Sequence, residues 1–466
     1  MSGMDWDTII SVTGGSWGVE PAVGQMLPVG AAIDTRELHR GQIFVAYVGE
    51  QVDGHEYLEQ ANGLGAAMCV VTDSSKIPDG FDVPTLVVDD STDALTALAK
   101  HWGSLLGGII IGVTGSNGKT TTTRLIHAVL SRAGESWVSS KSHNNAIGVP
   151  MSILNAPIEA RYVIFELGTS SPGEIADRAA LVEPDISVIT SIGRAHLEEL
   201  GSIEGVCAEK ASILGETQTL GIVPGGIDEL DYAIGLASVG CEIERVAEDR
   251  LGNIEIADQS VSFDLDGYRF TAPVPGVHNA SNAAMAVLVG RACNMSDADI
   301  AAGLAQSKLP EMRLDRIEIP TKSDSIVIYN DAYNANPDST RAALAFFASI
   351  QSEANKVIIL GDMLELGIAS ESEHQSMVAD LDIDAGRVVL VGPMYARAAG
   401  QGDEICPKTD DHAMSELGRT IKPGDLVLLK GSRGIGLERL VYILINRHTP
   451  FARSSGRRPG EGNAES

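Results

Sequence analysis

Basic residues, cysteines and long apolar runs are all scarce in this chain of 466 residues. Only 34 Lys and Arg stand against 63 Asp and Glu, so the formal net charge at pH 7 is −29. A polyanion repels such a chain unless a local basic stripe overcomes the overall field. The one arginine cluster, at residues 453–458, lies in a tail rich in Gly, Pro and Ser. The composition therefore argues against a nucleic-acid partner.

No stretch of the sequence approaches roughly eighteen consecutive apolar residues, which argues against a membrane-spanning helix. The first seven residues include two Asp and no basic residue, so they lack the layout of a secretory signal. The five cysteines are scattered singly, without the spacing of a metal site. An odd and sparse count is typical of reduced thiols. We therefore expect a cytoplasmic protein without membrane insertion.

Short β-branched runs recur along the chain, and each is followed by a longer segment with helical spacing. Residues 109–113, 162–165 and 357–360 are three of these runs. Near-continuous apolar strands that alternate with helices are typical of parallel sheets covered on both faces. The sequence therefore predicts an α/β fold, and its length predicts two to four domains at roughly 100–200 residues each.

Shifts in this pattern divide the chain into three blocks and a tail. Within the second block, residues 220–275 contain short strands and turns such as Asp266-Gly267, which predict an antiparallel patch on a central sheet. We expect a small α/β domain at residues 1–88, a central domain at 89–311, a C-terminal domain at 312–450 and a disordered tail at 451–466.

The strongest local motif lies at residues 111–121, between a predicted strand and a predicted helix. Its glycines allow backbone N–H groups to turn towards a phosphate, and the helix N-terminus adds a positive dipole end. Lys119 supplies a mobile charge for phosphate oxygens, and the Thr120 hydroxyl can ligate Mg²⁺. Val113 stands where the usual motif begins with glycine, and the alternative is a tight turn that merely carries Lys and Thr. We predict a nucleoside triphosphate site at Gly115, Ser116, Asn117, Gly118, Lys119, Thr120 and Thr121.

Three further polar residues follow the next predicted strands. Glu166 ends the strand at 162–165, where a carboxylate would face the same crevice as the phosphate loop. The alternative is a solvated carboxylate at a strand end. His196 taken alone is more often structural than a ligand, and Lys210 taken alone resembles a solvated helix cation.

Taken together, these residues and several longer motifs resemble the Mur ligase family over nearly the whole chain. The blocks 331–337 (Asp-Ala-Tyr-Asn-Ala-Asn-Pro) and 360–367 (Leu-Gly-Asp-Met-Leu-Glu-Leu-Gly) are the most specific, and they point to the branch that adds D-alanyl-D-alanine. The other matching segments are 34–36, 41–46, 53–55, 141–150, 276–282 and 430–434.

The resemblance implies a UDP-binding first domain, a central ATPase-type sheet and a C-terminal domain of Rossmann-like fold. It implies an ATP- and Mg²⁺-dependent ligase, acting as a monomer, that joins D-alanyl-D-alanine to UDP-N-acetylmuramoyl-tripeptide through an acyl phosphate in peptidoglycan synthesis. In this reading Lys119, Glu166, His196 and Lys210 are catalytic, and the metal ligands are Thr120, Glu166, His196 and a carbamate on Lys210.

Further roles follow from the same resemblance. Asn282 and Asp331 are expected to bind the adenine and ribose, and Arg313 the phosphates. Met312 replaces the common glycine before Arg313, which predicts a stiffer hinge between the second and third domains. The residues expected to contact the two other substrates are Thr35, Arg36, Asn144, Asn145, Asn334 and Asn336.

Other functions stay open at this stage. A relative that adds a single amino acid to the stem peptide usually carries Asp-Asn-Pro-Arg in its last domain, and that tetrapeptide is missing here. Folylpolyglutamate synthetases share the phosphate loop but lack the Tyr-Asn-Ala-Asn-Pro run. A third alternative is a nucleotide-binding relative without ligase turnover. The presence of the four predicted catalytic residues, Lys119, Glu166, His196 and Lys210, argues against it. The identity of the third stem residue, lysine or a diamino acid, is left open.

Overall fold

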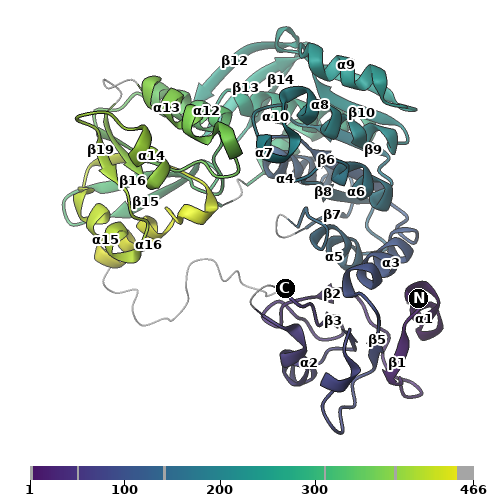
Figure 1. Cartoon of the computed structure of the whole chain (residues 1–466). Helices are drawn as coiled ribbons and strands as arrows, with labels where there is room; N and C mark the ends of the chain where they lie inside the picture. Colours follow the sequence, from purple (N-terminus) through teal and green to yellow (C-terminus); the bar gives the residue numbers. More distant parts are fainter. Residues whose placement is uncertain (1–3, 50–51, 140–142, 309–310, 382–385, 449–466) are drawn as a thin grey trace.

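The computed structural model describes residues 4–49, 52–139, 143–308, 311–381 and 386–448 (Figure 1). Its strands form four sheets, and helices cover the three larger ones. This arrangement confirms the predicted α/β fold. The predicted tail at 451–466, and Lys141-Ser142 of the 141–150 motif, lie outside the described residues. The exact domain boundaries stay predictions.

The N-terminal sheet has the strand order β1-β5-β4-β3-β2, parallel except for β1. Its inner strands β3 and β4 are buried along their whole length, which explains their apolar sequence. The elements of this part are α1 (Trp6–Thr13), β1 (Ser16–Val19), β2 (Ala31–Ala32), β3 (Ile43–Val45), η1 (Gly54–Tyr57), α2 (Leu58–Leu64), β4 (Met68–Val71), η2 (Ser74–Lys76) and β5 (Thr85–Val87).

The central sheet is parallel throughout, with the order β11-β10-β9-β6-β8-β7. Strand β6 lies between β8 and β9, so the strand order reverses direction at its carboxyl end, where ligands bind in open α/β sheets. The elements are α3 (Ser91–Gly103), β6 (Ile109–Thr114), α4 (Lys119–Leu130), β7 (Ser136–Val138), α5 (Gly148–Asn155), β8 (Tyr162–Glu166), α6 (Glu174–Val182), β9 (Ile186–Ile189), α7 (Leu197–Leu200), α8 (Ile203–Ala211), η3 (Ser212–Gly215), β10 (Leu220–Pro224), α9 (Asp228–Leu236) and β11 (Glu242–Val246).

The predicted antiparallel strands are present, but they form a separate sheet, β12-β13-β14, instead of extending the central one. Helix α10 packs between the two sheets, and its buried side chains join both in one apolar cluster. The elements of this segment are η4 (Glu248–Arg250), β12 (Leu251–Ala257), β13 (Ser260–Leu265), β14 (Tyr268–Ala272), α10 (His278–Ala292) and α11 (Asp297–Ala305).

The C-terminal sheet has the order β15-β16-β20-β17-β18-β19, with only β15 antiparallel. Apolar clusters cover both of its faces, as expected for a sheet between two helix layers. The elements are β15 (Asp315–Pro320), β16 (Ser325–Asp331), α12 (Pro337–Ser349), β17 (Asn355–Gly361), η5 (Gly367–Ala369), α13 (Ser370–Ala379), β18 (Arg387–Val391), α14 (Pro393–Ala398), β19 (Glu404–Cys406), α15 (Asp411–Thr420), β20 (Asp425–Lys430), η7 (Arg433–Ile435) and α16 (Arg439–His448).

Asn155 joins the N-terminal sheet to the central part of the chain. Its side-chain oxygen accepts from Gln42 Nε2 at 2.7 Å and from the Ala31 amide at 3.3 Å. Its amide nitrogen donates to the carbonyl oxygens of Ala31 at 2.9 Å and Met151 at 2.8 Å. One apolar cluster also runs from the N-terminal sheet through α3 and α5 to the central sheet, and Figure 1 shows these two helices between the two sheets. The N-terminal sheet is therefore joined to the central part of the chain both by hydrogen bonds and by a shared apolar core.

No helix within the described ranges is both long enough and apolar enough to cross a membrane.

The joint at Asn155 yields a stability prediction. Asn155→Ala leaves the Gln42 amide and the Ala31 backbone without partners, and we expect a loss of about 1–3 kcal/mol of folding free energy. Asn62→Ala, which removes an exposed hydrogen bond to Asp82, is the matched control and should change stability little. Thermal melting of the two variants checks this, and equal melting temperatures would contradict the joint.

Candidate active site

The phosphate loop runs from the end of β6 into α4, and it is tied to the segment that follows β9. The Ser116 amide donates to the Ser191 carbonyl oxygen at 2.9 Å, and the Asn117 amide donates to Ser191 Oγ at 2.9 Å. Ser116 Oγ also donates to the Gly193 carbonyl oxygen at 3.1 Å. The loop is therefore held by the neighbouring strand's loop as well as by its own helix.

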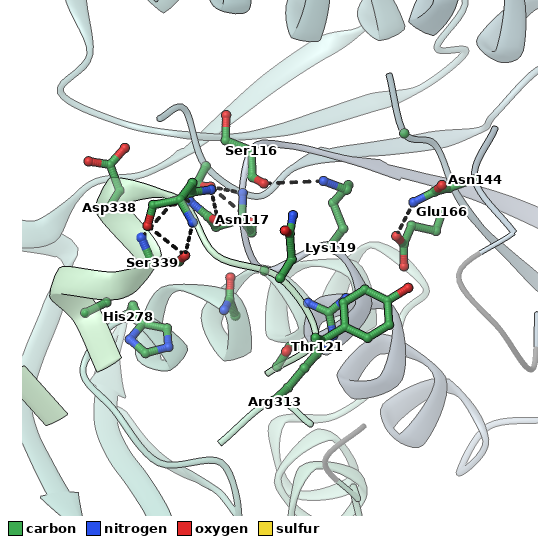
Figure 2. Close-up of a pocket in the computed structure, with 18 of the residues that line it drawn as sticks. Ser116, Asn117, Lys119, Thr121, Asn144, Glu166, His278, Arg313, Asp338 and Ser339 are labelled. Carbon is green, nitrogen blue, oxygen red and sulfur yellow. Dashed lines mark hydrogen bonds between the residues drawn. The ribbon is translucent and has the colours of Figure 1, made fainter. Parts of the chain in front are cut away.

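Two features of the loop suit an anion. Gly118 caps α4 with a left-handed φ of 82°, which turns the loop so that helix α4 begins at Lys119. Lys119 Nζ lies over the loop and donates to the Gly115 carbonyl oxygen at 2.6 Å. It also donates to the Ser116 carbonyl oxygen at 3.4 Å (Figure 2). Burial lowers the pKa of Lys119, whereas the nearby Glu166 carboxylate acts in the opposite direction. A phosphate would supply the negative charge that this buried ammonium needs.

Glu166 ends β8 beside the loop and is 7% exposed. Thr120 Oγ1 donates to its Oε2 at 2.7 Å, and Asn144 Nδ2 donates to its Oε1 at 2.7 Å. The pairing of Val113 with Glu166 across β6 and β8 sets this position, as the strand-end argument predicted. A hydroxyl and a carboxylate oxygen, both hard donors, therefore meet at the start of α4.

Lys210 is buried on α8 with 1% of its surface exposed. Among the described residues, its Nζ has no hydrogen-bond partner. Burial lowers the pKa of Lys210 well below its ordinary value, and the positive charge of Lys119 lowers it further. The alternative interpretation of Lys210 as a solvated cation on a helix surface is therefore wrong. An unpaired ammonium group at this depth would be energetically costly.

His196 lies on the wall of the site with a left-handed φ of 56°. Its Nδ1 lies 3.2 Å from Glu365 Oε2, a carboxylate contributed by the C-terminal sheet's loops. The hydrogen bond from His196 lowers the pKa of the Glu365 carboxyl group. His196 is thus in contact with a residue that follows it by more than 160 positions.

The facing wall comes from the carboxyl ends of β16 and β20. Asp331 and Lys430 end these neighbouring strands, and their side chains form a largely buried ion pair at 2.6 Å. Lys430 Nζ also donates to the Asn334 carbonyl oxygen at 3.0 Å. The Arg313 guanidinium lies 4.2 Å from the centre of the Tyr333 ring, a cation–π contact at the mouth of the crevice.

Met312, before Arg313, has a left-handed φ of 58°. This backbone conformation favours glycine, so the structure gives a physical reason for the glycine expected there. Whether methionine makes the hinge stiffer stays a prediction.

The two walls meet in direct polar contacts. Asn336 Nδ2 donates to Asn117 Oδ1 at 2.8 Å, and the Asn336 side chain also caps α12 (Figure 2). The Arg194 amide donates to Asp338 Oδ2 at 2.7 Å, and the Arg194 guanidinium pairs with Glu373 at 3.0 Å. The phosphate loop and the segment after β9 are therefore bridged to α12 and α13.

Asn282 lies against the phosphate loop from α10. Its Nδ2 donates to Asn279 Oδ1 at 2.8 Å, and a Cβ atom at Gly118 would lie 2.5 Å from its Oδ1. His278, at the start of the same helix, lines the crevice, and burial lowers the pKa of its imidazole.

A cavity of about 490 Å³ joins most of these groups, but Lys210 is not among the described residues that line it. The predicted site residues that line it are Ser116, Asn117, Gly118, Lys119, Thr121, Asn144, Asn145, Glu166, His196, Asn282, Arg313, Asp331, Asn334 and Asn336. Thr120 contacts the cavity through Glu166, and the Gly115 carbonyl oxygen does so through Lys119. The structure does not bring Thr35 and Arg36 to this cavity: Thr35 is buried in the N-terminal part, and Arg36 is exposed and paired with Asp34.

Comparison with known proteins decides the family. The family model of the Mur ligase middle domain matches residues 113–290, and that of the Mur ligase, glutamate ligase domain, matches residues 315–433. A UDP-N-acetylmuramoyl-tripeptide–D-alanyl-D-alanine ligase of Bacillus subtilis is 35% identical over 91% of this chain and 95% of its own length. This chain belongs to the Mur ligase family. It is therefore an ATP-dependent ligase that forms amide bonds.

Other Mur ligases agree in sequence and fold. The enzyme of the same name from Escherichia coli is 31% identical over 88% of this chain and 92% of its own. A crystal structure of MurF from Acinetobacter baumannii superposes with a TM-score of 0.80 at 30% identity, covering 94% of this chain and 98% of its own. The MurF ligase of Thermotoga maritima in complex with ADP shares the fold, with a TM-score of 0.75 at 23% identity over 91% and 99% of the two chains.

Sequence reasoning missed several residues of this Mur ligase site. Glu365 and Lys430 lie inside motifs that the sequence singled out, but without assigned roles. Asp338 directly follows the 331–337 motif, and Arg178 carried no signal at all. Glu373, which pairs with Arg194 and does not line the cavity, carried none either. Only the tertiary arrangement places Glu365 beside His196 and the buried Arg178 on the lining of the cavity.

Gly118 offers a sharp test of the loop. In Gly118→Ala the new Cβ would collide with Asn282, whereas in Gly173→Ala, at the N-terminus of α6 with φ 88°, it would meet nothing within 4 Å. Both variants carry the strain of a left-handed alanine, about 1 kcal/mol. We expect Gly118→Ala alone to weaken binding of an ATP analogue at least about tenfold in calorimetry. Equal affinities in the two variants would contradict the assignment of this loop.

Proposed function

We propose that this chain uses ATP to join D-alanyl-D-alanine to UDP-N-acetylmuramoyl-tripeptide, in the cytoplasm, during the synthesis of peptidoglycan precursors for the cell wall. The observation that carries this proposal is the similarity, over about nine tenths of the chain, to two ligases that bear this name. The geometry supports it, because the phosphate loop and Glu166 line one cavity with Asp331, Asn334 and Glu365, which belong to the two motifs most specific to this branch.

The reaction must overcome a chemical obstacle. A substrate carboxylate is a poor electrophile, since its negative charge repels nucleophiles and oxide is a very poor leaving group. In the proposed sequence a carboxylate oxygen attacks the γ-phosphorus of ATP, ADP leaves, and an acyl phosphate forms. The free amine of D-alanyl-D-alanine then attacks the acyl carbon, a tetrahedral intermediate collapses, and phosphate and a proton leave.

The chain's own groups address the repulsion between carboxylate and triphosphate. Lys119 and the N-terminus of α4 offer positive charge in a partly buried crevice, where each charge interacts more strongly than in water. Arg313 lies at the mouth of the same cavity, where it can contact phosphate oxygens. By holding the two walls together, the polar bridges would help to keep water away from the acyl phosphate.

The residues present also fit Mg²⁺. Within the described ranges no three His, Cys, Asp or Glu side chains gather closely enough to hold a metal alone, so an ion here would share its coordination with phosphate oxygens. Thr120 and Glu166 supply hard oxygen donors 2.7 Å apart. When bound, Mg²⁺ supplies charge neutralisation between the phosphate groups. We assign a second ion to His196 and Lys210.

Lys210 fits that second position only after modification. Burial lowers the pKa of Lys210 and so favours its neutral amine, and a neutral amine can attack CO₂ through its lone pair and lose a proton to give a carbamate. The carbamate would turn an unpartnered, buried amine into an anion with two oxygen donors. Its orphaned Nζ is the observation that supports this modification.

We also propose contacts to the other two substrates. Thr35 and Arg36 belong to the N-terminal part, where we assign the uridine diphosphate, and Asn144 and Asn145 lie on the cavity wall near Glu166. Asn334 faces the cavity from the C-terminal wall and suits a contact to the dipeptide, whereas Asn336 is already bonded to Asn117. We assign a monomer, as is usual for this fold.

The function is tested with defined substrates. We expect phosphate release only when ATP, UDP-N-acetylmuramoyl-tripeptide and D-alanyl-D-alanine are all present, and mass analysis should find the pentapeptide product. Single amino acids offered with the shorter UDP-linked dipeptide are the controls. Turnover with those controls and not with D-alanyl-D-alanine would favour a ligase that adds one amino acid, and no turnover with any acceptor would favour a silent relative.

Chemical rescue tests the modified lysine. We expect Lys210→Ala to lose nearly all activity and to recover part of it when formate or acetate is added, because a small carboxylate can occupy the place of the carbamate. Lys119→Ala should also be inactive but should not recover, since a carboxylate cannot replace its positive charge. A fully active Lys210→Ala variant, or equal rescue of both variants, would contradict the carbamate.

A further inference from the structure

The loop that carries Glu365 is rigidly fixed to the C-terminal sheet. Asp362, with 1% of its surface exposed, accepts from the backbone amides of Met394 at 2.9 Å and Tyr395 at 2.8 Å. Two residues further along the chain, the Leu364 amide donates to Ser432 Oγ at 2.9 Å. The residues that flank Glu365 therefore move with the C-terminal sheet.

The far side of this loop rests on the segment that contains His196. A Cβ atom at Gly367 would lie 2.8 Å from the side chain of Glu198, which belongs to α7 and follows His196 by two residues. Between these contacts, Glu365 reaches the His196 ring at 3.2 Å. The carboxylate is exposed to the crevice, with 63% of its side chain accessible, so it contributes little to the stability of the fold.

Both partners of this contact have unusual backbones. Glu365 has a φ of 62° and His196 a φ of 56°, and left-handed conformations of residues other than glycine cost about 1 kcal/mol each. Such strain persists only where the surrounding structure imposes it, and it is concentrated at functional sites.

The chemistry of the pair fixes the orientation of the ring. A carboxylate only accepts hydrogen bonds, so the Nδ1 that faces Glu365 must carry the proton. In the neutral imidazole the free lone pair is then on Nε2, and that nitrogen is the one available to a metal ion. Carboxylates that hold a histidine in this way tune metal sites in many proteins, and their loss costs about 10–100-fold in metal affinity or activity.

We propose that Glu365 is a positioning residue that acts across the crevice: it fixes the tautomer and orientation of His196 when the C-terminal sheet docks on the central one. When the C-terminal sheet docks, Glu365 thereby sets which nitrogen of His196 is available to the metal. The metal site is in this way linked to the docking of the C-terminal wall, to which we assign the dipeptide. This inference rests on the proposed role of His196 as a metal ligand.

Glu373 supplies a matched control. It also reaches the segment after β9 from the C-terminal side, but its carboxylate pairs with Arg194 and does not contact His196. Glu365→Ala and Glu373→Ala therefore each remove one carboxylate from the same interface, and only the first touches the imidazole. Glu365→Gln keeps a side-chain oxygen that can accept from Nδ1.

The test uses the full chain with a non-hydrolysable ATP analogue and with Mn²⁺ in place of Mg²⁺. Mn²⁺ affinity is measured by electron paramagnetic resonance, and the His196 ring is followed by ¹⁵N resonances of labelled histidine, assigned with His196→Ala. We expect Glu365→Ala to weaken Mn²⁺ binding about 10–100-fold and to lose the protonated-Nδ1 signature. Glu365→Gln should restore most of both, and Glu373→Ala should leave both unchanged, with melting temperatures close to the parent's.

Unchanged Mn²⁺ affinity and ring resonances in Glu365→Ala would overturn the proposal. An equal loss in Glu373→Ala would overturn it too, because docking in general and not Glu365 would then govern the site. His196→Ala separates this proposal from the one on which it rests: if that variant binds Mn²⁺ normally, His196 is not a metal ligand and the proposed second ion site is wrong.

Discussion

The site depends on one spatial constraint: the carboxyl edges of two separate parallel sheets must face each other. Lys119, Glu166 and His196 follow strands of the central sheet, whereas Asp331, Glu365 and Lys430 follow strands of the C-terminal sheet. Neither edge alone contains both a phosphate loop and a wall for an amine acceptor. The hydrogen bond between Asn117 and Asn336 spans 219 positions of the chain, and it joins the phosphate loop itself to the opposite wall.

Burial lowers the pKa of two lysines in this part of the chain, and we propose opposite roles for them. Lys119 has a lowered pKa but lies beside Glu166 and the open cavity, so an incoming phosphate can hold it in its charged form. Lys210 lies deeper, has no partner among the described side chains and feels the positive charge of Lys119. Burial, and secondarily the charge of Lys119, lowers the pKa of Lys210 and so favours the neutral amine, which is the form that the proposed carbamate requires.

The sequence predicted the order of strands and helices and the phosphate loop, because buried parallel strands and glycine-rich turns leave strong local patterns. It could predict Glu166 for the same reason, since a strand end is a local feature. Glu365, Asp338 and Glu373 were beyond such reasoning: they are ordinary surface carboxylates until the two sheets meet. The separate antiparallel sheet was missed in detail, because only packing against α10 decides whether such strands extend a neighbouring sheet. The resemblance to a family identified the motifs, but it could not predict which of their side chains are in contact.

The chemical character of the interface explains how such a crevice can work repeatedly. Its bridges are polar and partly exposed, as in the pairs of Arg194 with Glu373 and of His196 with Glu365. Exposed ion pairs contribute about 0–1 kcal/mol each, so a few of them specify one docking geometry without making it permanent. The joint at Asn155, by contrast, adds an apolar core that continues from one sheet to the next. This asymmetry suits a ligase that admits three substrates and releases three products, because the N-terminal sheet shares an apolar core with the central one, whereas polar bridges such as these hold the C-terminal wall.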